Sequence, residues 1–238
     1  MTSIMIHQPE FMPWTNLFTK MAFCDYFVFL DNVQYARRSY QNRNKFKCSS
    51  GSKWLTVPVQ KVSRNELIKN IFIENSTDWK KLHKTFLKMA YGNTSHYDSV
   101  IQILDETYDQ NWTNLSDLNC NLTKLIANYL KFNNTFIRAS MLIDASEKSD
   151  RILNICQSLN ADKYICGLGS KTYLNEELFL KHGIEIVYLE PMNILHTQTY
   201  PDLGFINGLS VFDYLFNAGA EELLLNLSNY KNQYLSKL

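Results

Sequence analysis

Short apolar runs and stretches of helical spacing follow one another at the start of the chain. The runs Ser3–His7 and Tyr26–Leu30 have continuous apolar centres rather than alternating polarity. Between them, Trp14, Leu17 and Met21 recur at the spacing of one helix face. Strands that are apolar on both faces are typical of a parallel sheet covered by helices on two sides. This segment therefore predicts a β-loop-α-β unit of an α/β fold.

The same alternation returns in the second half of the chain. Apolar runs at Phe136–Ala139, Tyr164–Gly167 and Ile184–Leu189 predict further strands, and the segments between them have helical spacing. The last segment, Ser210–Leu225, has helical spacing as well. These elements continue the α/β pattern and add a helical segment at the C-terminal end.

Between these two halves the pattern changes. Trp54–Val59 predicts a strand at a sheet edge, because Pro58 cannot donate a backbone hydrogen bond, and Ile71–Ile73 is a further candidate strand. Apolar residues from Trp79 to Lys131 recur at helical spacing and predict three helices.

The predicted fold is therefore α/β, with a mostly parallel Rossmann-like sheet, a mid-chain helical insertion and a C-terminal helical segment. Residues 1–75 and 132–238 are assigned to the α/β domain and residues 76–131 to the insertion.

Composition excludes several classes of protein. A hydrophobic fraction of 45% indicates a compact globule, and a net charge of +1 lacks the basic excess of a nucleic-acid reader. No apolar stretch is long enough to span a bilayer, and Met1–Pro9 lacks the features of a secretory signal. The five cysteines are dispersed, which is typical of reduced thiols. We expect a cytoplasmic protein that binds no nucleic acid.

The first strand ends in a turn that carries candidate chemistry. His7, Gln8 and Glu10 follow this strand directly, and Trp14 begins the next helix. Ligands of open parallel sheets bind outside the carboxyl ends of the strands. His7 is a candidate general base, since the ordinary pKa of histidine lies near neutrality. The alternative is a histidine that only bonds the loop backbone.

The second strand is followed by the densest polar and basic stretch of the chain. Arginine guanidinium groups match phosphate geometry, and asparagine and glutamine side chains can read polar rings or hydroxyls. The stretch therefore suits a phosphate-bearing small molecule, while the alternative is the solvated face of a β-hairpin. The candidate residues are Asp31, Asn32, Gln34, Arg38, Gln41, Asn42, Arg43 and Asn44.

A third candidate is a small-residue turn between a strand and a helix. Gly167, Ser170 and Lys171 lie in this turn, where backbone N–H groups can approach an anion. The spacing matches neither a complete dinucleotide-binding loop nor a Walker loop, so an ordinary tight turn is an equal alternative. The five histidines share no ligand spacing, and we expect no metal.

Ordered motifs along nearly the whole chain resemble the WbqC-like protein family. This sequence departs from the family pattern at Leu168-Gly169, where Ser-Gly-Pro is common in the family. The resemblance therefore implies no specific role for that turn. The matching motifs are His7-Gln8-Pro9, Phe27–Tyr35, Arg38–Asn44, Trp54–Val59, Arg138-Ala139-Ser140 and Leu209–Asn217.

The resemblance implies work on a nucleotide-linked sugar in the biosynthesis of O-antigen or other surface polysaccharides, with N-acylation of an amino sugar as the leading reaction. In this hypothesis His7 takes the amine proton, and Asp31 or Glu10 orients the His7 side chain. Arg38 and Arg43 hold the nucleotide or diphosphate. The acyl donor is unassigned: an acyl-CoA, a folate or an aminoacyl species would serve.

Two alternatives stay open at this point. An ATP- or CTP-dependent ligase related to nucleotidyltransferases would release pyrophosphate, whereas an acyltransferase would not. A non-catalytic binding or assembly factor would return the nucleotide sugar unchanged. The exposed face of the helices from Phe212 to Leu225 is a candidate homodimer contact.

Overall fold

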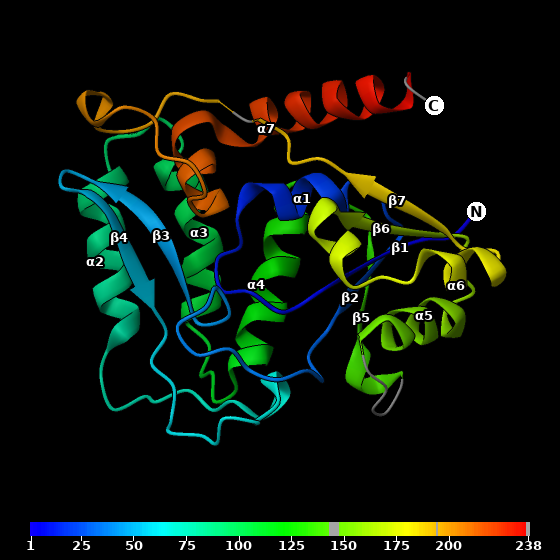
Figure 1. The fold of residues 1–238 in the computed structure, drawn as a ribbon. Coiled ribbons are helices and arrows are strands. Elements are labelled where there is room, and N and C mark those ends of the chain that lie inside the picture. The colour runs from blue at the N-terminus through cyan, green and yellow to red at the C-terminus, as the bar shows by residue number, and fades with distance from the viewer. Residues whose placement is uncertain (143–147, 194, 237–238) are drawn as a thin grey trace.

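A five-stranded, all-parallel sheet lies at the centre of the computed structural model, which describes residues 1–142, 148–193 and 195–236 (Figure 1). The order across the sheet is β5-β2-β1-β6-β7. Numbered along the chain, these strands have the order 3-2-1-4-5, which is also the order of the first five strands in one common doubly wound sheet. The predicted α/β fold is confirmed. The strands are β1 (Ser3–His7), β2 (Tyr26–Phe29), β5 (Thr135–Arg138), β6 (Lys163–Gly167) and β7 (Glu185–Leu189).

Both faces of the sheet are buried, which explains the continuous apolar runs in the sequence. Successive side chains of a strand point to opposite faces. Ile4 and Ile6 of β1 therefore belong to one apolar cluster, and Met5 between them belongs to the other. The first cluster packs under α5 (Lys148–Ser158) and α6 (Glu176–Lys181).

The opposite face belongs to a larger apolar cluster that is built by helices from distant parts of the sequence. Apolar side chains of these helices form one continuous cluster with the sheet and with a separate antiparallel hairpin (Figure 1). The helices are α1 (Thr15–Met21), α2 (Trp79–Tyr91), α3 (Tyr97–Tyr108), α4 (Leu115–Tyr129) and α7 (Val211–Leu235), and the hairpin strands are β3 (Arg43–Cys48) and β4 (Gly51–Thr56).

The middle of the chain follows the sequence prediction in part. The three predicted helices are present as α2, α3 and α4, and the division into an α/β domain and an insertion stays a prediction. Trp54–Val59 is a strand only to Thr56, in the hairpin and outside the main sheet. The candidate strand Ile71–Ile73 is wrong, because this segment makes only isolated bridges and no continuous ladder.

Within the described part of the chain, no helix is long and apolar enough to cross a membrane. The same residues include five free cysteines, four of them buried.

Helix α7 bends at Gly219, and the segments before and after the bend pack against different parts of the protein (Figure 1). Gly219 has φ 80° and ψ 175°, a backbone region that essentially only glycine adopts. A Cβ at this position would lie 2.7 Å from the His96 ring. Before the bend, Phe216 stacks on Tyr91 and Tyr97, and after it Tyr230 and Tyr234 contact Phe23. The glycine therefore lets one helix cover two regions.

Gly219→Ala is expected to lower the free energy of unfolding by about 2 kcal/mol, since alanine would meet both the unfavourable φ and the His96 ring. Urea unfolding measures this change. Gly169→Ala is the matched control: its φ is not in the left-handed region and its added Cβ meets open space, so its stability should equal or slightly exceed that of the wild type. The double substitution with His96→Ala should recover only the steric part. Equal stability of Gly219→Ala and the wild type would contradict this account.

Candidate functional site

The sheet places a cavity at its topological switch point. The chain leaves β1 toward β2 on one side, whereas β6 pairs with the opposite side of β1. Connections diverge at this position, which is where open α/β sheets bind ligands. A cavity of about 380 Å³ lies there, formed by the carboxyl ends of three strands and by α1. Its polar lining includes His7, Asn16, Lys20, Cys166, Ser170 and Glu190.

His7 ends β1 as a largely buried, neutral imidazole. Its Nδ1 lies 2.9 Å from the Gln8 carbonyl oxygen, and because a carbonyl only accepts, Nδ1 carries the hydrogen and Nε2 is left as an acceptor. Burial, with the nearby charge of Lys20, lowers the pKa of the imidazole to about 3. His7 is therefore a weak base at neutral pH. This lone-pair nitrogen lies 4.0 Å from the Glu10 Oε1.

Glu10 is the group of this cluster that titrates near neutral pH. Burial raises the pKa of its carboxyl to about 7, although the positive charge of Lys20 opposes the shift. Among the described residues, no hydrogen-bond partner is found for its buried Oε2. A carboxyl with this pKa can both accept and return a proton at pH 7.

Lys20 supplies a cation at the wall of the cavity. It lies in the last turn of α1, and a Cβ added at Gly167 would be 3.9 Å from its Nζ. Burial lowers the pKa of the ammonium, and the nearby Glu10 carboxyl opposes that effect. Within the described residues, no hydrogen bond or close ion pair is found for this ammonium. A partly buried cation without a close partner suits an anionic ligand.

The turn after β6 forms the facing wall. Of the three residues predicted for an anion-binding turn, Gly167 and Ser170 line the cavity, whereas Lys171 does not and instead lies over the Tyr188 ring at 4.8 Å. Residues Leu168–Thr172 form a 3-10 turn rather than the start of an α-helix. Burial raises the pKa of the Cys166 thiol to about 11, which leaves it a poor nucleophile.

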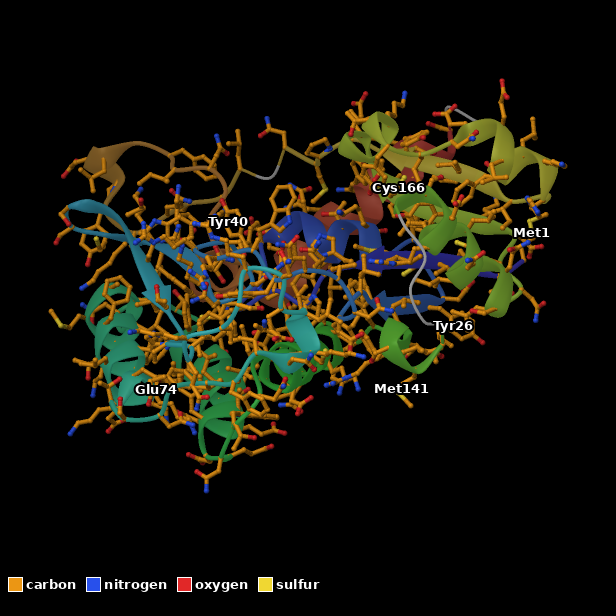
Figure 2. All side chains as sticks on the ribbon, turned by 60° about the horizontal axis from the view of Figure 1, so that its bottom comes forward. Met1, Tyr26, Tyr40, Glu74, Met141 and Cys166 are labelled. Carbon is orange, nitrogen blue, oxygen red and sulfur yellow. The ribbon has the colours of Figure 1, made fainter. Side chains whose placement is uncertain are left out.

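The polar stretch after β2 lies elsewhere. No residue of this described stretch, 31–45, lines the cavity, and Figure 2 shows Tyr40 of this segment apart from Cys166 at the end of β6. Asp31 is fully buried, and its two oxygens accept hydrogen bonds from the backbone N–H (2.9 Å) and hydroxyl (2.8 Å) of Ser140. Of the two carboxylates predicted to orient His7, Glu10 is the one beside it.

Amide side chains of this stretch hold irregular backbone in place. Gln41 donates to the Gln8 side chain at 2.7 Å, which ties the stretch to the loop after β1. Asn44, fully buried, donates to the Met12 carbonyl at 2.7 Å, and Asn42 donates to the Val57 carbonyl at 3.0 Å. Buried backbone groups need such partners, which accounts for the many Asn and Gln residues here.

The remaining candidates of the stretch lie on its surface side. Arg43 donates to the Arg38 carbonyl and stacks over the Trp54 ring at 4.1 Å. Arg38 is exposed and has a positive φ of 57°. Gln34 donates to the Arg64 carbonyl at 2.5 Å, and Asn32, partly buried, follows Asp31 in the turn after β2.

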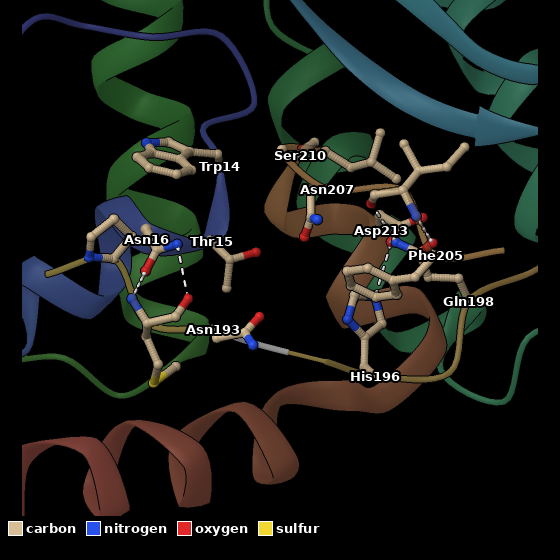
Figure 3. Close-up of a pocket in the computed structure, with 15 residues that line it drawn as sticks. Trp14, Thr15, Asn16, Asn193, His196, Gln198, Phe205, Asn207, Ser210 and Asp213 are labelled. Carbon is tan, nitrogen blue, oxygen red and sulfur yellow. Dashed lines mark hydrogen bonds and ion pairs between the residues drawn. The ribbon is translucent and has the colours of Figure 1, made fainter. Parts of the chain in front are cut away.

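A second cavity, of about 290 Å³, adjoins the first and contains a pair that the sequence did not single out (Figure 3). The His196 Nε2 lies 2.9 Å from Oδ2 of Asp213, which is buried at the start of α7. Gln198 donates to the same oxygen at 3.0 Å, and the Tyr91 hydroxyl donates to Oδ1 at 2.8 Å. The only sequence signal was Asp213 inside the motif Leu209–Asn217.

Lys47 fixes residues 198–206, called the covering loop below, which line part of this second cavity. Its side chain is buried under the loop and donates from Nζ to the Gly204 carbonyl at 2.6 Å. Gln198 and Ile206 exchange two further hydrogen bonds, of 3.0 and 2.9 Å, within the loop. The covering loop is therefore attached to the hairpin and to itself. Among the residues described, no group of three or more His, Cys, Asp or Glu is arranged to hold a metal ion.

Comparison with known proteins gives two matches along nearly the full chain. The model of the WbqC-like protein family matches residues 8–224. The uncharacterized protein Rv1507c of Mycobacterium tuberculosis is 33% identical over 225 residues, which cover 93% of this chain and 96% of that protein. No solved structure matches with statistical significance.

Glu10→Gln is expected to change how stability depends on pH. The unfolded carboxyl loses its proton near 4.5 but the folded one keeps it to about 7, so the folded state binds more protons between these values. The stability of the wild type should therefore fall across this window as pH rises. The substitution removes this loss, so the variant should gain up to about 3 kcal/mol relative to the wild type from pH 4.5 to 7.

Urea unfolding at several pH values measures the effect. Glu106→Gln, on the exposed surface of α3, is the matched control and should reproduce the wild-type profile. A difference between Glu10→Gln and the wild type that stays constant with pH would show that Glu10 has an ordinary environment.

Proposed function

Because the chain belongs to the WbqC-like protein family, we propose that it is a transferase that modifies a nucleotide-linked sugar, by N-acylation of an amino sugar. The observation that carries the proposal is the switch-point cavity, where the Lys20 ammonium faces the turn after β6 and a neutral His7 lines the wall. Glu10 lies directly behind this lining, with its Oε1 4.0 Å from the His7 Nε2. A cation and a backbone turn provide an anion site, and the carboxyl provides proton transfer.

In this proposal the phosphate groups of the substrate bind at Lys20 and the Gly167–Ser170 turn. The amine nitrogen of the sugar attacks the carbonyl carbon of an activated acyl donor, such as a thioester, and a C–N bond forms. The Glu10 carboxylate takes the amine proton. The tetrahedral intermediate then collapses, the bond to the leaving group breaks, and Glu10 returns the proton to that group.

His7 has a positioning role in this scheme rather than that of the base. Its lone-pair Nε2 faces Glu10 and can accept a hydrogen bond from the protonated carboxyl, which fixes the direction of the proton. Asp31 has a structural role in this scheme, because its hydrogen bonds with Ser140 hold the turn after β2 in place. Arg38 and Arg43 are assigned no contact with the phosphates.

Binding is tested by thermal shift with a panel of nucleotide-linked amino sugars, since a ligand that binds the folded state raises the melting temperature. A member of the panel should stabilise the wild type, and Lys20→Met should abolish that stabilisation by removing the cation. Lys171→Met is the matched control, because its ammonium lies over Tyr188 outside the cavity lining and should leave the shift intact. Equal shifts in both variants would contradict the anion site.

Turnover is tested with the same sugar and a set of acyl donors. Glu10→Gln should bind the sugar normally but lose about 10²-fold or more in rate, and the wild-type rate should rise with pH through about 7 as the carboxyl ionises. Unchanged turnover in Glu10→Gln would remove Glu10 from the reaction. Release of pyrophosphate from a nucleoside triphosphate would instead indicate a ligase, and return of the sugar unchanged with every donor would indicate a binding factor.

A further inference from the structure

The second cavity shares a wall with the first. Trp14, Asn16 and Pro191 line both cavities, so the two spaces lie on either side of the first turn of α1. Figure 3 shows Trp14 and Asn16 on one side of the second cavity and His196, Gln198 and Asp213 on the other. The two cavities are therefore immediate neighbours.

Several polar side chains of the second cavity are used to hold its walls. The Asn16 side chain accepts from the Met192 N–H at 2.8 Å and donates to the Met192 carbonyl at 3.2 Å. Gln198 bonds Ile206 and Asp213. Both oxygens of Asp213 accept hydrogen bonds as well. These groups fix the shape of the cavity rather than face a ligand.

Other polar side chains point between these walls without partners. Within the described part of the chain, no hydrogen bond is found for the side chains of Thr15, Asn193 or Asn207, and Figure 3 shows all three between the Trp14 side and the His196 side. The buried Nδ1 of His196 also lacks a partner among those residues. In the neutral ring, an Nε2 that donates to the Asp213 carboxylate leaves Nδ1 as an acceptor, which a ligand O–H or N–H can satisfy.

The lining also defines the charge of the ligand. No lysine or arginine is among the described residues that line this cavity, and its one carboxylate is already hydrogen-bonded through both oxygens. Trp14 and Phe205 add aromatic surface. An aromatic wall with unpaired amide and hydroxyl groups suits an uncharged ring that carries several hydrogen-bonding groups.

We propose that the second cavity binds the uncharged ring of a ligand, a sugar ring or a nucleobase, through Thr15, Asn193, Asn207 and the Nδ1 of His196. The ring is joined across Trp14 to an anionic group at Lys20. This connection rests on the proposed function, whereas the ring site itself does not.

The test measures binding of methyl N-acetylglucosaminide, uridine and UDP-N-acetylglucosamine by ligand-observed NMR and calorimetry. The wild type should bind the conjugate and at least one of the two neutral compounds, and the neutral compound that binds identifies the ring as sugar or base. Thr15→Val with Asn207→Ala should weaken both kinds of ligand by about tenfold, the loss expected for two hydrogen bonds. Lys20→Met should weaken only the conjugate.

Thr77→Val with Asn111→Ala is the matched control, because these exposed residues line a distant surface hollow near α2. This control should bind every ligand as the wild type does. Binding that is unaffected by the Thr15 and Asn207 substitutions, or no binding of either neutral compound, would overturn the ring site. If a neutral compound binds and the conjugate does not, the ring site stands and the proposed function fails.

Discussion

A loop without regular structure crosses the interior of this protein, and its buried backbone groups must find hydrogen-bond partners there. Residues 8–14 run from the end of β1 to the start of α1, and Met12 within them is fully buried with a positive φ of 46°. Asn44 of the hairpin donates to carbonyls of this loop, as does Asn119 of α4, and the Pro13 carbonyl accepts the N–H of Val211 at the start of α7. One buried loop thus joins the hairpin, α4 and α7, and it positions Glu10 and Trp14.

The titratable groups of the site owe their properties to this burial. Water is excluded from the end of β1, so the charged forms of His7 and Glu10 are disfavoured and their pKa values move in opposite directions. The nearby charge of Lys20 adds to the lowering of the His7 pKa and opposes the raising of the Glu10 pKa, without a direct ion pair to either group among the described residues. Two neighbouring groups with divergent pKa values are a common basis for acid–base chemistry, whereas ordinary surface pairs keep ordinary values.

Sequence patterns predicted the main sheet well. Strands that are buried on both faces form continuous apolar runs, and such runs can be recognised in the sequence without knowing which strands pair. The position of His7, Glu10 and Gly167 at strand ends followed from the same rule. The role of the polar stretch Asp31–Asn44 was harder to predict. The sequence does not distinguish an Asn or Gln side chain that hydrogen-bonds buried backbone from one that binds a ligand. The His196–Asp213 pair depends on a contact between a loop and α7 that no local spacing encodes.

The buried ammonium of Lys47 has a consequence for how a ligand would arrive. The ammonium donates a hydrogen bond to the Gly204 carbonyl of the covering loop, and Gln198 donates another to the Ile206 carbonyl within the same loop. A loop already fixed in this way does not have to lose conformational freedom when a ligand enters, so little of the binding free energy is spent on ordering. The ligand then enters a preformed cavity and needs no loop closure. The association rate should therefore depend on the frequency of encounter more than on internal motion of the protein.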